Sequence, residues 1–189
     1  MRDEPGTETR SNLRAGPPLR LHHHAFAVKD QEVNRKFFED LLGMPLIATW
    51  CERVFNKELG READYCHTFY GLADGSALAF FQFADAEVYE RSKPTHPESG
   101  TWHVALKVSR ASFDEIRQRV EAAKLTHRIT DHGYCLSLYL TSPDGLRIEF
   151  TVDPPNVEAI NAKRRGDARA ELARWLKGDH RPNNEDRPH

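Results

Sequence analysis

The clearest fold signal in the chain lies in residues 132–149, HGYCLSLYLTSPDGLRIE. From Leu136 to Leu140, leucine alternates with other residues, the period of two that is typical of a strand with two different faces. Residues 142–145, SPDG, predict a tight turn, because proline fixes φ and glycine permits a reversal. Apolar alternation then predicts a second strand over 146–152, on which Glu149 points away from the apolar face.

The composition limits the classes of protein to which the chain can belong. Its 189 residues are enough for one good-sized core but too few for two large domains. The formal net charge is −2 and the charges are interspersed, so no nucleic-acid partner is expected. No apolar run approaches membrane-spanning length, and no membrane partner is expected either. The three cysteines lack metal-type or redox-motif spacing, which favours a reducing, cytoplasmic location.

Outward from the hairpin, apolar periodicity and cap residues predict an alternation of strands and helices. A charged insertion at 52–64 is expected to form a surface loop, and Ser112 with Glu115 suggests a capping box at the start of a helix. The fold class is therefore predicted to be α+β, with strands at 20–28, 45–50, 67–72, 77–83, 101–108 and 126–130 and helices at 31–42 and 112–123.

Both ends of the chain differ in composition from this patterned region. Residues 1–19 are polar, with proline and glycine, and are expected to form a flexible arm. The C-terminal extension, 154–189, is predicted to hold helices at 156–165 and 167–177 before a disordered polar tail from 178. The second helix carries an apolar stripe of Ala168, Leu172, Trp175 and Leu176. Packing on the main domain is the commonest role of such a stripe, and the alternatives are to cover the mouth of the site or to join subunits.

The patterned region repeats itself as βαβββ twice, which is the most informative feature of the sequence. HHAFAV from His23 aligns with HVALKV from His103, so His23 is selected from three adjacent histidines. Alignment of the two Asp-Gly turns pairs Ala79 with Glu149. From the histidine to the position of the carboxylate, the second module spans 46 residues (149 − 103). The first module spans 56 residues (79 − 23) to the equivalent Ala79. The ten extra residues fall in the charged insertion.

Two equivalent histidines and one carboxylate predict a metal site shared by the modules. A single strand histidine is more often a packed or surface residue than a ligand, and a single strand glutamate is usually solvated. The coincidence of His23, His103 and Glu149 at repeat-equivalent positions favours the metal site over that interpretation. A set of two histidines and one carboxylate suits non-haem Fe(II), with Mn(II) or Zn(II) as alternatives.

These patterns resemble the vicinal oxygen chelate superfamily of glyoxalases, bleomycin resistance proteins and extradiol dioxygenases. The resemblance covers a domain at 20–153, with module one at about 20–90 and module two at about 100–153. It implies paired βαβββ modules that form a half-open β-barrel, with metal ligands at the positions already named. Ala79 occupies the fourth ligand position, and its methyl group argues against glyoxalase chemistry.

Within that superfamily the C-terminal hairpin resembles the ring-cleavage signature of single-domain type I extradiol dioxygenases. The signature would run from Thr130 through His132 and Tyr139 to Glu149, with Ser142 as a minor departure. The resemblance implies that His132 and Tyr139 are catalytic and that the chain is an Fe(II) enzyme, forming a homodimer or higher homo-oligomer. It would cleave a small aromatic diol, such as a 2,3-dihydroxybiphenyl-like catechol, with O2.

One histidine of the larger extradiol enzymes is missing, and alternatives remain open. No histidine occupies the strand at 75–77, where those enzymes carry an acid–base group, and His67 or His96 is a weak candidate to replace it. The alternative functions are a metal-dependent transferase, epimerase or glyoxalase-like lyase, and a metal-free binding or sequestering protein. A sequestering protein has no need of the three ligands, whereas a transferase would share them without the His132–Tyr139 signature.

Overall fold

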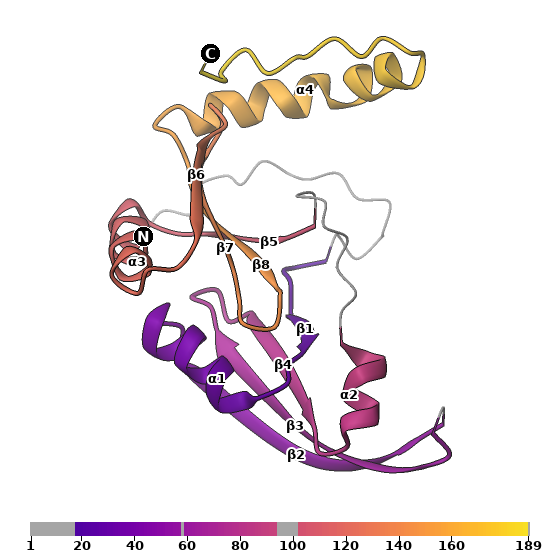
Figure 1. Cartoon of the computed structure of the whole chain (residues 1–189). Helices are drawn as coiled ribbons and strands as arrows, with labels where there is room; N and C mark the ends of the chain where they lie inside the picture. Colours follow the sequence, from indigo (N-terminus) through magenta and orange to yellow (C-terminus); the bar gives the residue numbers. More distant parts are fainter. Residues whose placement is uncertain (1–17, 58, 94–101, 189) are drawn as a thin grey trace, which may run out of the picture. The chain divides into compact units, whose positions relative to one another are not determined.

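The computed structural model describes residues 18–57, 59–93 and 102–188. His96 and all but the last two residues of the predicted arm lie outside these ranges. The described chain divides into two compact units (Figure 1). Unit 1 runs up to Gln31 and continues over Met44–Ser92, and unit 2 comprises Glu32–Gly43 and the described residues that follow Ser92.

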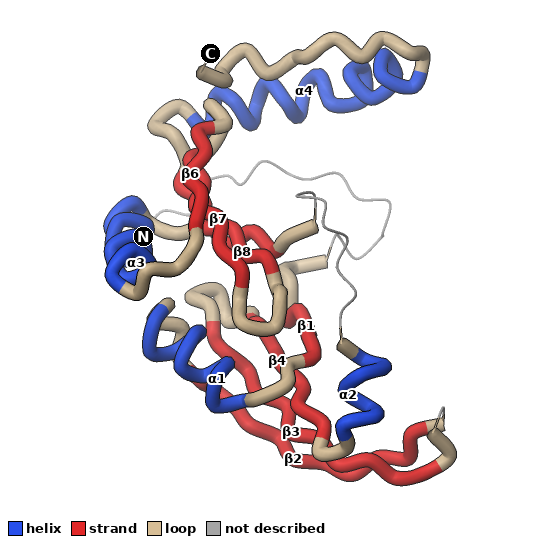
Figure 2. Tube along the Cα trace, in the orientation of Figure 1, coloured by secondary structure: helices blue, strands red, loops and turns tan. Residues whose placement is uncertain are grey.

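Each unit contains one open four-stranded sheet, and the two sheets have the same topology (Figure 2). In both, the first strand runs parallel to the last, and the remaining neighbours are antiparallel. This confirms the α+β class and the repeat. Sheet A has the order β1-β4-β3-β2, from β1 (His23–Ala27), β2 (Leu46–Asn56), β3 (Arg61–Gly71) and β4 (Ala77–Phe83). Sheet B has the order β5-β8-β7-β6, from β5 (Val104–Lys107), β6 (His127–Asp131), β7 (Leu136–Thr141) and β8 (Arg147–Val152).

The strand register supports the alignment of the two modules residue by residue. Ala25 of β1 lies opposite Ala79 of β4, and Ala105 of β5 lies opposite Glu149 of β8. Ala79 therefore occupies in sheet A the position that Glu149 occupies in sheet B. His23 and His103 each lie two residues before the alanine of their own module.

The charged insertion is not a surface loop, so that prediction was wrong. Residues 52–56 continue β2 and 61–64 continue β3, which lengthens one hairpin instead of interrupting it. Arg53 lies opposite Asp64, and its guanidinium donates two hydrogen bonds to that carboxylate, of 2.5 and 2.8 Å. Opposite charges facing each other across an antiparallel pair stabilise the sheet, so charged composition did not prevent strand formation.

The helices confirm some boundaries and correct others. The first helix begins as α1 (Gln31–Arg35) and continues as the π-helix η1 (Lys36–Leu41), and Gly43 follows it with φ of +73°. The helix α2 (Ala86–Ser92) was not predicted. The helix α3 begins earlier than expected, over Arg110–Ala122, because Ser109 is the N-cap and accepts a hydrogen bond from the Ser112 amide.

The hairpin that dominated the sequence forms β7 and β8, as predicted. Its apolar face is buried, with Leu138, Ile148 and Phe150 at most 2% exposed. The helix α3 contacts β8 and buries Phe113 and Val120. Burial of one face leaves the other face of sheet B, the one that carries Glu149, to polar residues.

The C-terminal extension departs furthest from its prediction. It holds one helix, α4 (Val157–Leu176), where two were expected. The stripe does not pack on the domain: Leu172, Trp175 and Leu176 are 60, 55 and 75% exposed. Among the described residues no helix is long and apolar enough to cross a membrane.

The polar tail was expected to be disordered, but residues 178–188 run back beside α4 (Figures 1 and 2). Side-chain contacts hold the tail along the helix. Arg174 hydrogen-bonds to Asp179, and Lys163 pairs with Glu185. Arg164 donates to the carbonyl of Asn183. Charged side chains on α4 thus bind a segment that has too little apolar surface to pack by itself.

Candidate functional site

A row of four residues crosses the polar face of sheet B. Ala105 lies opposite Glu149, Glu149 opposite Tyr139, and Tyr139 opposite Arg128. Residues that face one another across neighbouring strands project from the same side of a sheet. The pairing of β6, β7 and β8 therefore brings a carboxylate, a phenol and a guanidinium together from three separate parts of the sequence.

Tyr139 connects the two ends of the predicted site by hydrogen bonds. Its hydroxyl donates to Glu149 Oε1 at 2.7 Å and lies 2.9 Å from His132 Nε2. Because the phenol proton goes to the carboxylate, Nε2 of His132 must carry the proton that it donates to the phenol oxygen. On the other carboxylate oxygen, His103 Nε2 lies 2.7 Å from Glu149 Oε2. The sequence-predicted residues of module two thus form one connected chain of contacts.

The electrostatics of this chain follow from burial. Glu149 is only 5% exposed, and its carboxylate contacts the phenol of Tyr139 and the imidazole of His103. Burial, followed by the hydrogen bond to Glu149, raises the pKa of Tyr139 to about 12. The phenol is therefore protonated at neutral pH, where it acts as a hydrogen-bond donor and not as a base.

The donor set of module two fits a divalent cation. Its imidazole nitrogen and carboxylate oxygen, His103 Nε2 and Glu149 Oε2, lie 2.7 Å apart, and both are atom types that bind divalent transition metals. A phenol on the second oxygen also suits a ligating carboxylate, since such carboxylates are usually hydrogen-bonded in turn. Among the described residues, however, no three His, Cys, Asp or Glu side chains gather into a metal-binding group.

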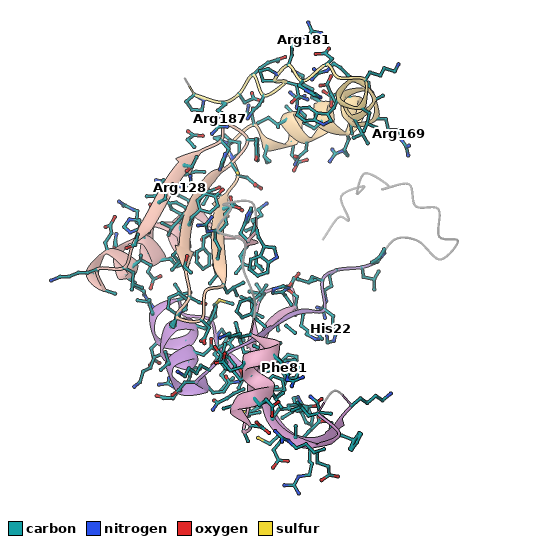
Figure 3. The ribbon with its side chains drawn as sticks, turned by 45° about the vertical axis from the view of Figure 1, so that its right-hand side comes forward. His22, Phe81, Arg128, Arg169, Arg181 and Arg187 are labelled. Carbon is teal, nitrogen blue, oxygen red and sulfur yellow. The ribbon has the colours of Figure 1, made fainter. Side chains whose placement is uncertain are left out.

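The third predicted ligand, His23, belongs to unit 1, so the complete ligand set stays a prediction. Its exposed imidazole has Nδ1 2.8 Å from Nδ1 of His22, and its ring meets Phe69 edge-on at 5.5 Å between centroids. Ala79 is fully buried and offers no donor. Figure 3 shows the neighbouring His22 projecting from the start of this segment.

His67, the weak candidate for an acid–base group, lies in an aromatic cluster of sheet A. Its ring stacks on Phe81 with centroids 3.6 Å apart and also meets Phe69 at 4.4 Å. Burial lowers the pKa of His67, and the nearby charge of His23 lowers it further. A neutral imidazole packed between rings is favoured over a charged one here.

Two arginines beside Tyr139 were missed by sequence reasoning. Arg128 Cζ lies 4.7 Å from the centroid of the Tyr139 ring. A cavity of about 360 Å³ opens beside it, lined by Thr126, His127, Arg128, Tyr139, Leu140, Thr141 and Arg147. Neither guanidinium has a carboxylate within ion-pair distance in the described part of the chain. Arg147 could have been found from the sequence, because the alternation of β8 puts it on the same face as Glu149. Arg128 could not, because only the pairing of β6 with β7 shows that it lies opposite Tyr139.

The C-terminal tail contacts the loop that presents His132. The amide of Asn184 donates to the backbone carbonyl of His132 at 2.9 Å. Gly133 has φ of +79°, and a Cβ placed there would lie only 2.0 Å from the carbonyl oxygen of Asp186. The loop thus requires glycine for two reasons, its left-handed backbone and the close approach of the tail.

Comparison with known proteins supplies a family and several relatives. A family model described as the Glyoxalase/Bleomycin resistance protein/Dioxygenase superfamily matches residues 20–150. The glutathione transferase FosA of Serratia marcescens is 26% identical over 132 residues, which cover 70% of this chain and 79% of that protein.

Two solved structures share the fold. A glyoxalase/dioxygenase from Nostoc punctiforme superposes with a TM-score of 0.52 at 22% identity, over 77% of this chain and 99% of that one. The second is a mutant of the fosfomycin resistance protein FosX from Listeria monocytogenes, solved with Mn(II) and 1S,2S-dihydroxypropylphosphonic acid. It superposes with a TM-score of 0.51 at 15% identity, over 76% of this chain and 99% of that one.

Proposed function

Because the chain belongs to the Glyoxalase/Bleomycin resistance protein/Dioxygenase superfamily, we propose that it is a divalent-metal-dependent enzyme acting on a small anionic substrate. The observation that carries this proposal is the buried Glu149 carboxylate, with Tyr139 on one oxygen and His103 on the other. A buried carboxylate is retained where a partner compensates its charge, and a metal ion is a common partner of this kind.

The proposed ligands of the metal are His23, His103 and Glu149. Imidazole and carboxylate donors suit Fe(II), Mn(II) and Zn(II), and the relative solved with Mn(II) supports that ion as the first to test. When bound, such an ion polarises an oxygen of the substrate as a Lewis acid.

Two features favour transfer of a nucleophile over ring cleavage. Arg128 and Arg147, which have no carboxylate partner among the described residues, form a cationic edge beside Tyr139, which suits a phosphonate or carboxylate. The FosA relative is a glutathione transferase by name. In such a reaction a thiol sulfur bonds to a substrate carbon, a C–O bond breaks, and the freed oxygen takes the proton that the thiol gives up.

The phenol of Tyr139 has a defined role in this proposal. With its pKa raised to about 12 it keeps its proton at neutral pH, so it donates either to Glu149 or to a substrate oxygen. His132 Nε2–H donates to the phenol oxygen and fixes its orientation. Tyr139 would position the substrate and the carboxylate while it keeps its proton, and His132 would hold the phenol in place.

Ring cleavage is the second candidate, and one contact favours it. His132 and Tyr139, the two catalytic residues of the extradiol signature, touch at 2.9 Å. In that case the metal would be Fe(II) and the substrates O2 and a catechol-type diol such as 2,3-dihydroxybiphenyl. The contact is equally compatible with the first candidate, and the cationic edge has no role with an uncharged diol.

One experiment separates the candidates. The full chain is purified without oxygen, its metal content is measured, and Mn(II)- and Fe(II)-loaded samples are assayed in parallel. Fosfomycin with glutathione is followed by mass spectrometry of the adduct, and catechol or 2,3-dihydroxybiphenyl with O2 is followed by the yellow product. A glutathione adduct of fosfomycin in the Mn(II) sample supports nucleophile transfer. A yellow product in the Fe(II) sample, with no adduct in either sample, would overturn that proposal in favour of ring cleavage.

The chelated sample tests the remaining alternative, a metal-free binding protein. If the protein binds fosfomycin or a catechol equally well after treatment with EDTA, and turns over neither, the enzyme proposal fails. We also propose a homodimer or higher homo-oligomer, which sedimentation of the full chain tests directly.

A further inference from the structure

Cys51 and Cys66 do not have the spacing of a redox motif in the sequence, but they lie directly opposite each other on β2 and β3. Opposed residues of an antiparallel pair have Cα atoms about 4.5–5.5 Å apart. Disulfide-bonded cysteines have Cα atoms about 4.4–6.8 Å apart, so the backbone already satisfies that requirement. Both side chains are free thiols, and because opposed residues project from the same side of a sheet, the two thiols share one face of the hairpin.

The surroundings of the pair make the two thiols unequal. Cys51 is exposed and Cys66 is half-buried. Burial raises the pKa of the Cys66 thiol, and the neighbouring Cys51 thiol raises it further. Both line a cavity of about 600 Å³ whose wall also includes Gln31, Glu52, Arg53, Asp64, Tyr65 and Gln82. A small reagent therefore reaches the exposed Cys51 thiol more readily than the half-buried Cys66 thiol.

We propose that Cys51 and Cys66 form a dithiol site that a low-molecular-weight disulfide, such as glutathione disulfide, oxidises to an intrachain disulfide. In the first step the Cys51 thiolate attacks one sulfur of the reagent, the S–S bond breaks, and one equivalent of thiol leaves. In the second step the Cys66 thiolate attacks Cys51 Sγ and displaces the other equivalent. Two protein thiols and one disulfide thus become one protein disulfide and two small thiols.

The third cysteine provides an internal control. Cys135 belongs to unit 2, where its thiol contacts Ser137 Oγ at 3.4 Å. Burial raises its pKa, and in the described residues it has no cysteine opposite it on a neighbouring strand. The proposed chemistry should therefore consume two of the three thiols and spare Cys135.

The test uses the reduced full chain, incubated with glutathione disulfide without oxygen. Free thiols are counted with Ellman's reagent, and peptides are mapped by mass spectrometry without reduction. The expected result is the loss of two thiols, a crosslink between the Cys51 and Cys66 peptides, and no glutathione left on the protein. Glutathione retained on Cys51, a disulfide-linked dimer, or a crosslink through Cys135 would each overturn the proposal.

Variants test the order of the steps. Cys66→Ser should retain one glutathione as a stable mixed disulfide on Cys51, because the resolving thiol is gone. Cys51→Ser should react more slowly than Cys66→Ser, since its remaining thiol at this site is the half-buried one. Cys135→Ser should form the crosslink at the same rate as the natural chain. If Cys51→Ser reacts faster than Cys66→Ser, the assignment of Cys51 as the attacking thiol is wrong.

Discussion

The phenol of Tyr139 donates a 2.7 Å hydrogen bond to Oε1 of Glu149, from the strand next to the one that carries the carboxylate. This contact links the two halves of the hairpin that the sequence singled out. Because Oε1 accepts the hydrogen bond from the phenol, Oε2 is the oxygen that faces His103. The metal-binding role proposed for module two depends on this arrangement.

The hydrogen bond itself is tested by Tyr139→Phe, which keeps the ring and removes the hydroxyl. Loss of a residue that orients a ligating carboxylate typically lowers metal affinity by about 10–100-fold, and we expect a fall in that range by calorimetric titration with Mn(II). The control is Tyr134→Phe, since Tyr134 is 49% exposed and its ring stacks on His132 instead of bonding to the carboxylate. Equal affinities of Tyr139→Phe and the natural chain would contradict the role given to the phenol.

The ligand assignment is tested by His103→Ala and Glu149→Ala. Each should leave protein without bound Mn(II) after gel filtration, measured as metal per chain by mass spectrometry, and activity should fall with metal content. His180→Ala, which removes a histidine from the tail beside Trp175, is the control and should keep full occupancy. Full occupancy in His103→Ala or Glu149→Ala would exclude that residue from the ligand set.

The cationic edge is tested by Arg128→Gln. Loss of a charged hydrogen-bond donor to a bound anion is worth roughly 1.5–3 kcal/mol, so KM for an anionic substrate should rise by about tenfold or more while metal content stays unchanged. Arg169→Gln is the matched control, because Arg169 lies on α4, away from the β6 strand (Figure 3). An unchanged KM in Arg128→Gln, with metal and fold intact, would remove the basis for an anionic substrate.

The contact between the tail and the His132 loop is tested by two glycine substitutions of opposite expected sign. Gly133→Ala forces a Cβ to within 2.0 Å of the Asp186 carbonyl in a left-handed backbone, so the free energy of unfolding should fall by about 1–2 kcal/mol or more. Gly166→Ala, inside α4 with nothing within 4 Å, should instead raise it by about 0.5–1 kcal/mol. Thermal and urea unfolding measure both. A stable Gly133→Ala would show that the tail does not dock as described.

The acid dependence of tail docking follows from Asp179. Hydrogen bonds from Arg181, followed by those from Arg174, lower the pKa of Asp179 to about 2. A depressed carboxyl pKa contributes stability above the unfolded value of about 4 and loses it as pH falls through the folded value. The difference in melting temperature between the natural chain and Asp179→Asn should therefore be constant from pH 7 to 5 and narrow as the pH approaches 2. A difference that is independent of pH would contradict this ion-pair role.

Much of the fold was predictable because strand and helix periods are local properties of the sequence. The alternation at 136–152 indicated the hairpin, and the HHAFAV and HVALKV segments indicated the repeat. Local signals failed where side-chain partners lie far away in sequence. Charges at 52–64 suggested a loop, but Arg53 and Asp64 neutralise each other across β2 and β3. The tail looked disordered because its polar composition gives no sign that the chain turns back along α4, where Lys163 and Arg164 bind residues 22 and 19 positions away in sequence.

For the candidate site, the sequence by itself identified residue types and faces: His103, Glu149, His132 and Tyr139 in module two, and Ala79 as a position without a donor. Periodicity tells which side of a strand a residue occupies, but it carries no information about distance across strands. Only the tertiary structure showed that Tyr139 bonds to both His132 and Glu149, that Arg128 lies over the same ring, and that Cys51 faces Cys66. These contacts depend on strand register, which is decided when separate segments of the chain pair and pack together.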